Sequence, residues 1–209
     1  MSREKDLAKS YNAIAQVSID AMQEKFIEYY TQAAANIIPK FEALYSKVLL
    51  AAKGRKTEPA DLYHLDDYWI LQKEIKQELE EFGKELILFS CLQYKTMFID
   101  VYEGTAINGK TLTCKLSNMA IAKVIGKPWK ERVWIERIWI NLSCLYDGLF
   151  ARLMEYVIKN GKNPNKLTAL LQEEFEASRK GANTIINTHS TVVQTHALAK
   201  VYRHIRKGY

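Results

Sequence analysis

The sequence predicts an all-α protein with a long helical hairpin or arm, a packed C-terminal helical unit and one small β-hairpin or ordered loop near residues 104–114. Apolar residues recur at steps of three and four along most of the 209 residues, which is the spacing of one helix face. Glycine and proline, which interrupt helices, fall between these stretches. Together the two patterns divide the chain into successive segments of a single domain with an arm.

Residues 1–58 are expected to form N-terminal helices. Ile14, Val17 and Phe26 fall near helical spacing in the first part. Pro39 is expected to break the helix or to start a new one, because proline has no backbone N–H for the hydrogen bond of a helix interior. Residues 54–61 combine glycine, proline and charged side chains without a hydrophobic face, so they predict a connector.

Residues 59–103 are expected to hold the longest helix, beginning at Asp61 or Asp66 and ending near Tyr102. Beyond Leu86 it is apolar on all sides, which predicts that its second half enters the core. Gly83 costs a helix about 1 kcal/mol relative to alanine, so we expect another helix to approach closely there. The apolar stripe of this helix consists of Tyr68, Leu71, Ile75, Leu79, Phe82, Leu86 and Phe89.

Residues 104–127 are expected to form a connector made of a hairpin and a short helix. Asn108 and Gly109 favour a two-residue hairpin turn, since both central positions of a type I′ turn need a positive φ. Threonine and isoleucine on either side suit short strands. Ser117 is placed to cap a short helix that leads to Pro128.

Residues 128–209 are expected to form the C-terminal helical unit. A tryptophan-rich helix comes first, and its apolar residues cover most of its circumference, which predicts a central helix with neighbours on several sides. Asn160 and Gly161 predict its end, because both residues tolerate the left-handed conformation. A short amphipathic helix at 163–178 and a separate last helix are expected to follow. The main apolar face of the first helix is Trp134, Ile138, Leu142, Leu145 and Leu149.

The cysteines and the apolar runs restrict the class of protein. Cys91, Cys114 and Cys144 are widely spaced and odd in number, which favours reduced, buried thiols over a disulfide framework. No apolar run reaches about 18 residues, so we expect no transmembrane helix and no membrane partner. The N-terminus is charged and lacks the apolar stretch of a secretory signal.

The net charge of +6 is concentrated at the C-terminal end, because residues 179–209 contain lysine and arginine but no acidic residue. Such a face can bind nucleic-acid phosphates without sequence preference. A solvated helix end, where cations favour the helix dipole, explains the same pattern and stays open. The candidate DNA-binding residues are Lys200, Arg203, Arg206 and Lys207.

Several aromatic, hydroxyl and imidazole side chains are candidates for a partner interface. His189 and His196 lie seven residues apart on one face of the last helix, a spacing that suits an interface or a half-buried pair better than a metal site. The threonines around Thr188 can bond carbonyls one turn back or a neighbouring helix. Trp69 and Trp129 lie near element ends, where aromatic side chains can anchor a partner.

Catalysis is poorly supported by the sequence. It contains no glycine-rich phosphate loop, no G-x-S-x-G and no H-E-x-x-H. We therefore expect no enzyme, no cofactor and no metal site. An enzyme remains an alternative only if the fold brings a carboxylate such as Asp147 or Glu174 to one of the two histidines.

The order of elements after residue 128 resembles the C-terminal region of the phage minor head proteins, the Mu F-like head morphogenesis family. The residues that carry the resemblance are Trp129, Arg132, Val133 and Trp134, then Gly161, then Thr188 with His189. His189 stands where the family is expected to have an acidic residue. The resemblance implies a non-enzymatic, portal-associated protein inside the virion head, present in multiple copies and located in the host cytoplasm during assembly. Its implied partners are the portal or other head proteins, and packaged double-stranded DNA bound non-specifically.

A second interpretation is a helical DNA-binding or regulatory protein with a basic C-terminal face and no role in a head. Sequence-specific binding would require base-reading side chains on a recognition helix. Asn183, Asn187 and Gln194 are the candidates, and they are spread over several faces of the last helix.

Overall fold

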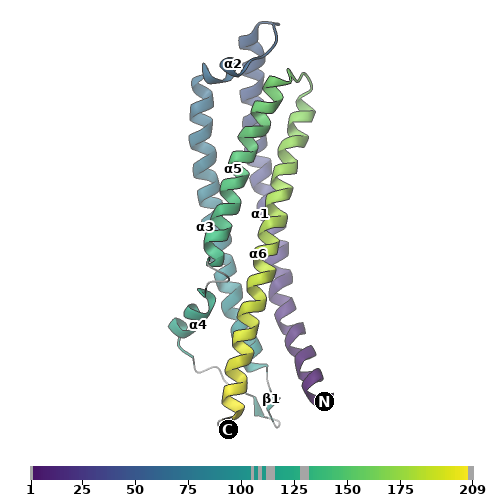
Figure 1. Ribbon diagram of the computed structural model, residues 1–209, viewed down its shortest axis with the longest axis vertical. Helices are drawn as coiled ribbons and strands as arrows, with labels where there is room; N and C mark the ends of the chain where they lie inside the picture. The colour runs from purple at the N-terminus through teal and green to yellow at the C-terminus, as the bar shows by residue number, and fades with distance from the viewer. Residues whose placement is uncertain (1, 105, 108–109, 112–115, 128–131, 207–209) are drawn as a thin grey trace. The chain divides into compact units, whose positions relative to one another are not determined.

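The protein is all-α, as the sequence predicts, in a computed structural model that describes residues 2–104, 106–107, 110–111, 116–127 and 132–206 (Figure 1). Only the backbone is described for residues 2–10, 106–107, 110–111, 164 and 204–206. The elements are α1 (Ser2–Ala52), α2 (Pro59–Tyr63), α3 (Asp66–Glu103), β1 (Ala106–Ile107), β2 (Lys110–Thr111), α4 (Asn118–Ile125), α5 (Trp134–Ile158) and α6 (Pro164–Arg206).

The chain forms two compact units, and α1, α3, α5 and α6 each supply residues to both. The first unit comprises Met1–Lys25, Leu86–Ile138 and Asn183–Tyr209. The second comprises Phe26–Glu85 and Trp139–Ala182. Each unit is described separately below.

The second unit has a core of aliphatic and aromatic side chains from α1, α3, α5 and α6. Tyr30 packs edge-on against Phe82 with 4.9 Å between ring centroids, and Tyr45 packs in the same way against Tyr156 at 5.0 Å. Such edge-to-face pairs stabilise a core by about 0.5–1.5 kcal/mol beyond the area that they bury. Fully or nearly fully buried core residues include Phe26, Ile37, Phe41, Val48, Ile75, Leu149, Leu153, Val157, Leu167 and Leu171.

Pro39 does not break the first helix, so the expectation of a break there is wrong. The helix α1 continues from Ser2 to Ala52 with Pro39 inside it. An internal proline costs a helix about 3 kcal/mol. Ile37, Ile38 and Phe41 lie on either side of the proline and are all buried, whereas Pro39 itself is exposed. Their burial offsets the lost hydrogen bond and keeps one helix through this position.

The predicted short helix at 163–178 and the predicted last helix form a single helix, α6. Gly181 lies inside it and marks a close contact instead of a break. A Cβ atom at Gly181 would lie 2.5 Å from the Asn141 side-chain oxygen on α5. The same Asn141 amide donates to the Ser178 carbonyl at 2.8 Å and to the Tyr30 hydroxyl at 3.1 Å. Glycine is therefore required for the approach of α5 to α6.

The tryptophan-rich helix α5 begins at Trp134, and the predicted start at Pro128 lies outside the described residues. Its end is as predicted. Asn160 has a φ of 52°, and Gly161 N–H donates to the Tyr156 carbonyl at 3.1 Å, which is a left-handed helix cap. The expectation of a central helix is wrong in part, because within the second unit one stripe of α5 faces solvent. This exposed stripe contains Ile140, Ser143, Cys144, Asp147 and Ala151.

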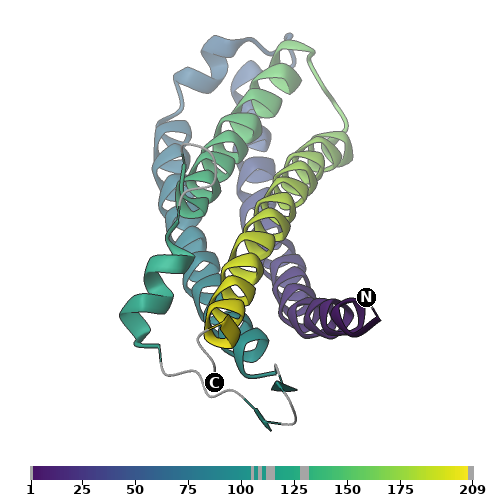
Figure 2. The same cartoon turned by 60° about the horizontal axis from the view of Figure 1, so that its bottom comes forward.

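The first unit combines the N-terminal part of α1, the C-terminal part of α3, the two strands, α4, the start of α5 and the C-terminal part of α6. The strands β1 and β2 pair antiparallel with Ala106 opposite Thr111, at the place of the predicted hairpin (Figure 2). The predicted turn residues Asn108 and Gly109 lie outside the described residues. As predicted, Ser117 caps α4, its side chain accepting from Ala120 N–H at 3.2 Å.

The cysteines follow the prediction only in part. Cys91 and Cys144 are both free, and Cys114 lies outside the described residues. Cys91 is half-buried, but Cys144 is exposed, so the expectation of a buried thiol is wrong there. Cys144 lies on the solvent-facing stripe of α5. The largely apolar sequence of this helix gives no indication of such a stripe.

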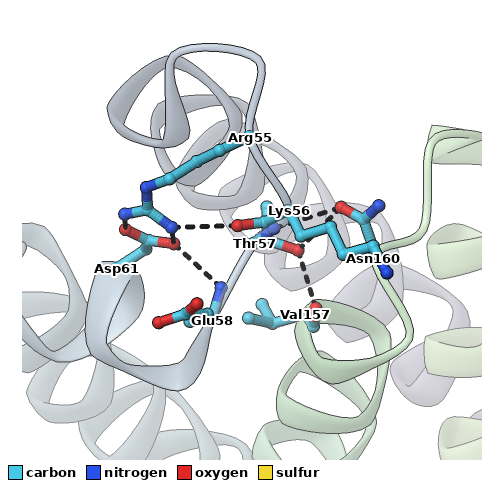
Figure 3. Close-up of polar contacts among 7 residues, drawn as sticks. All are labelled: Arg55, Lys56, Thr57, Glu58, Asp61, Val157 and Asn160. Carbon is cyan, nitrogen blue, oxygen red and sulfur yellow. Dashed lines mark hydrogen bonds and ion pairs between the residues drawn. The ribbon is translucent and has the colours of Figure 1, made fainter.

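A polar network in the second unit joins the connector after α1 to the end of α5 (Figure 3). The Arg55 guanidinium binds both carboxylate oxygens of Asp61, and this contact holds the pKa of Asp61 below its ordinary value. Asp61 also accepts from Glu58 N–H at 2.8 Å. The buried Thr57 hydroxyl donates to the Val157 carbonyl at 2.7 Å.

Replacing Thr57 by valine is expected to lower the free energy of unfolding by about 1 kcal/mol, the typical net contribution of one hydrogen bond. The substitution keeps the shape of the side chain but removes the hydroxyl that donates to the Val157 carbonyl, which then keeps the Asn160 N–H as a donor, at 3.0 Å. Urea unfolding followed by circular dichroism measures the change. Thr31→Val is the matched control, because Thr31 is exposed and donates only within its own helix, to the Ile27 carbonyl at 2.7 Å. Equal effects of the two substitutions would contradict the prediction.

Candidate nucleic-acid interface

The C-terminal part of α6 carries two of the predicted DNA-binding residues on one face. His196, Lys200 and Arg203 follow one another at steps of four and three, so their side chains leave the helix on the same side. Arg203 is exposed, and Lys200 and His196 are half-buried. Arg206 is the last residue of α6, but its side chain is not among those described, and Lys207 lies outside the described residues.

Lys127, just after α4, contacts this face, although no pattern in the sequence points to it. Its Nζ lies 2.8 Å from Nε2 of His196. A lysine ammonium has donors only, so Nε2 of His196 is the acceptor and the imidazole is neutral. The two residues are 69 positions apart, which explains why no local pattern points to the contact. We call Lys127, His196, Lys200 and Arg203 the basic cluster.

Burial and the positive charges of the basic cluster lower the pKa of His196. Burial is the largest cause that lowers the pKa of His196, and the positive charge of Lys127 is the next. Arg203 and Lys200 lower the pKa further, while a backbone contact with Val192 acts in the opposite direction. The cluster therefore presents cationic side chains around a neutral imidazole, which is an arrangement that attracts anions.

His189 lies in the core of the first unit, with only 2% of its surface exposed. Its ring stacks on Trp134 at 5.6 Å between centroids and meets the Tyr94 ring edge-on at 4.8 Å. Burial lowers the pKa of His189 to about 4. The Ile125 backbone opposes that shift, yet neither ring nitrogen has a hydrogen-bond partner of normal geometry. A partner cannot contact this side chain while the first unit stays folded.

The other predicted interface residues lie at different places. In the second unit, Trp69 is 53% exposed, stacks on Tyr63 and donates its indole N–H to the Tyr63 carbonyl at 3.2 Å. In the first unit, the Thr188 hydroxyl donates to the Thr184 carbonyl at 2.8 Å, one turn back on α6. Trp129 lies outside the described residues. Trp69 and Thr188 are therefore each held by contacts of their own and do not share a site.

Two of the three candidate base-reading residues are occupied by contacts within the first unit, and the third, Asn183, is half-buried with its side-chain oxygen covered. Asn187 accepts from the Gln23 side chain at 3.0 Å, and Gln194 donates to the Asn12 side chain at 2.7 Å. Both contacts join α6 to α1. These side chains hold the two helices together, so they are not free to read base edges while α1 is in place.

The arrangement of ionisable groups does not favour catalysis. Within the described part of the chain, no set of three histidine, cysteine or acidic residues has the geometry of a metal site. Among the described residues, no carboxylate hydrogen-bonds to His189 or His196. Glu174, one of the acids that the enzyme alternative requires, accepts instead from the Arg152 guanidinium at 2.8 Å.

Compared with protein-family models, with curated proteins and with solved structures, the chain matches none of them. No helix among residues 2–104, 116–127 and 132–206 contains a segment long and apolar enough to span a bilayer. The function therefore has to be inferred from the residues of the chain and their contacts.

Proposed function

We propose that this chain is a non-enzymatic minor structural protein of a phage head. It binds at the portal vertex inside the capsid, remains in the virion, and acts in head assembly and in positioning or releasing DNA. The proposal rests on the resemblance of the sequence after residue 128 to the Mu F-like family. Trp129, Arg132, Val133 and Trp134 carry it, followed by Gly161 and by Thr188 with His189. The short helix and the last helix of that pattern are one continuous helix, α6, in this chain, so the likeness is one of sequence and not of separate elements.

The contacts around these residues support a structural role. Trp134 is packed against Tyr94 and His189 in one core, so the tryptophan of the motif stabilises the first unit. Gly161 lies directly on Tyr156, where a Cβ atom would come within 2.2 Å of the ring. Tyr45 donates to the Gly161 carbonyl, which ties the turn to α1. Among the residues that carry the resemblance, Trp134 and Gly161 are thus part of the packing of their units.

Particle fractionation tests the role in the head. Heads purified from the source of this chain are expected to retain it at a low, fixed copy number, from a few to about a dozen, at the portal vertex. Removal of the portal from the particles is expected to remove the chain as well. Absence of the chain from full heads would overturn the proposal and move the regulatory interpretation to first place.

DNA binding tests the second part of the proposal. Charge reversal at Lys200, Arg203, Arg206 and Lys207 is expected to abolish the binding of duplex DNA at low salt, because phosphate contacts supply non-specific affinity. The measurement is fluorescence anisotropy with a labelled duplex. Charge reversal at the exposed Lys73, Lys76 and Lys84 of α3, together with Lys53 after α1, is the control with the same change in net charge. If the two variants bind equally, the C-terminal face does not contact DNA.

The regulatory interpretation also rests on the basic cluster, since a positive face serves any nucleic-acid-binding protein. The engaged Asn187 and Gln194 side chains favour a version without sequence preference. The two interpretations differ in where the chain is found. A head protein is counted in purified particles, whereas a regulatory protein is found free or on DNA in the infected or uninfected cell.

A further inference from the structure

The contact between Lys127 and His196 is an unusual element of the basic cluster. A lysine ammonium donates to a neutral imidazole at 2.8 Å, and two more cations lie on the same face of α6. In this contact the imidazole acts as an acceptor for the Lys127 ammonium.

We propose that Lys127, His196, Lys200 and Arg203 form one phosphate-binding site, in which His196 takes up a proton from solvent when a nucleic-acid phosphate binds. This inference rests on the DNA-binding part of the proposed function and not on the role in a head. A phosphate oxygen between the side chains accepts from Lys127, which releases Nε2 of His196. The released nitrogen then lies beside an anion, so the protonated imidazolium becomes the favoured form and adds a further donor.

The charged and titratable groups around His196 determine the direction of this coupling. Lys127 approaches from the end of α4, and Lys200 and Arg203 belong to α6. All of them oppose a positive charge on the imidazole. His189, seven residues earlier on the same face, is buried and neutral, and the protonation of the two histidines is mutually unfavourable. An added phosphate is therefore the group that reverses the balance.

The position of Lys127 distinguishes a phosphate site formed by two elements from basic residues at a solvated end of α6. Cations on the last turns of α6 alone would serve the helix dipole, and their effect would be limited to that helix. Lys127 belongs to another element, follows the α4 cap at Gly126 and reaches across to His196. A phosphate site that spans two elements requires Lys127, whereas a solvated helix end does not.

The test uses the full chain and a short labelled duplex, with affinity measured by anisotropy at pH 6.0 and pH 8.0 and constant low ionic strength. The duplex is expected to bind several-fold more tightly at the lower pH, because phosphate binding raises the pKa of His196 and the proton that the complex takes up is more available at pH 6.0 than at pH 8.0. His196→Gln is expected to bind as the parent chain does at pH 8.0 and to lose the gain at pH 6.0. Lys127→Gln is expected to bind more weakly at both pH values, with a salt dependence reduced by about one phosphate contact.

Lys84→Gln, on the exposed side of α3, is the control for the loss of one positive charge. Circular dichroism at both pH values establishes that each variant is folded. The proposal is overturned if Lys127→Gln binds like Lys84→Gln, or if His196→Gln keeps the full dependence on pH. Inorganic phosphate that competes at millimolar concentration with the same dependence on pH supports a discrete site, and a lack of such competition contradicts it. DNA binding that survives in these variants without dependence on pH would refute the coupling and leave the DNA-binding role intact.

Discussion

Replacing His189 by phenylalanine is expected to remove most of the acid sensitivity of the folded chain between pH 7 and pH 4.5. His189 is buried, and its ring lies between Tyr94 and Trp134. Phenylalanine keeps a flat ring of similar size and removes two nitrogens that lack partners of normal geometry. Each buried polar group without a partner costs about 1–3 kcal/mol, so the variant is also expected to be at least as stable at pH 7.

The direction of this pH effect follows from the difference between the pKa of His189 in the folded chain and its pKa in the unfolded chain. The folded chain holds this pKa at about 4, below the value of 6.5 for a free histidine. As the pH falls below 6.5, the unfolded chain binds a proton that the folded chain does not bind, and the free energy of unfolding decreases. A difference of this size corresponds to about 2.5 kcal/mol at pH 4.5. His196, whose pKa is also lowered, adds a smaller loss in the same direction.

Urea unfolding at half-unit steps from pH 7 to pH 4.5 measures the effect. Carboxylates with lowered pKa values, such as Asp61 and Glu155, begin to contribute only near the lower limit of this window, and they contribute equally in the parent and in the variant, so the difference between the two chains reports His189. His64→Gln is the matched control, because the His64 side chain is exposed, and this variant is expected to behave like the parent chain. A His189→Phe variant that loses stability as steeply as the parent would show that another group causes the acid sensitivity.

The spacing of apolar residues predicted where the chain is helical but not the lengths of the helices. The expectation that 59–103 holds the longest helix is wrong, because α3 has 38 residues whereas α1 has 51 and α6 has 43. Tyr68, Leu71 and Ile75 in the stripe of α3 are all buried, and the helix starts at Asp66, one of the two predicted positions. This succeeds because a helix that packs on one side must repeat its apolar residues with the period of the helix. Gly83 was also predicted to mark a close helix contact, and it does.

Breaks in the helices could not be predicted from proline and glycine alone. Pro39 and Gly181 have the local chemistry of helix interruptions, yet α1 and α6 continue through them. Their effect depends on what lies opposite. Ile37 and Phe41 are buried around Pro39, and the Asn141 side chain fills the space at Gly181. Local preferences of a few kcal/mol are overridden by packing that only the folded chain reveals.

The candidate interface was predictable in its charge but not in its composition. Lys200 and Arg203 stand out because residues 179–209 contain no acidic residue. Lys127 does not stand out in the sequence, because its contact with His196 depends on how α4 packs against α6. The two histidines looked equivalent in the sequence, but His189 is in the core and His196 is at the surface. Burial, which sequence spacing leaves open, separates a core histidine from one at the surface.

Replacing Gly83 by valine is expected to lower the free energy of unfolding by about 2–3 kcal/mol. A Cβ atom at Gly83 would lie 2.4 Å from Cζ3 of Trp139 and 2.7 Å from Cδ1 of Leu142. Both atoms belong to α5, and Leu142 is buried, so a valine side chain at this position overlaps with atoms that have to move before it fits. Overpacking of this kind costs about 1–3 kcal/mol, and the gain in helix propensity over glycine is smaller.

Two further variants separate steric overlap from helix propensity. Lys84→Val places the same β-branched side chain on the adjacent, exposed position of α3 and is expected to cost no more than about 0.5 kcal/mol. Gly83→Val combined with Trp139→Ala removes the ring that the new side chain meets, so the two substitutions together are expected to cost at least about 1 kcal/mol less than the sum of their separate effects. If the effects of the two substitutions on the free energy of unfolding, measured in urea, are additive, the new side chain at position 83 does not overlap with Trp139. A measured coupling would establish that α3 and α5 pack against each other at Gly83 in solution.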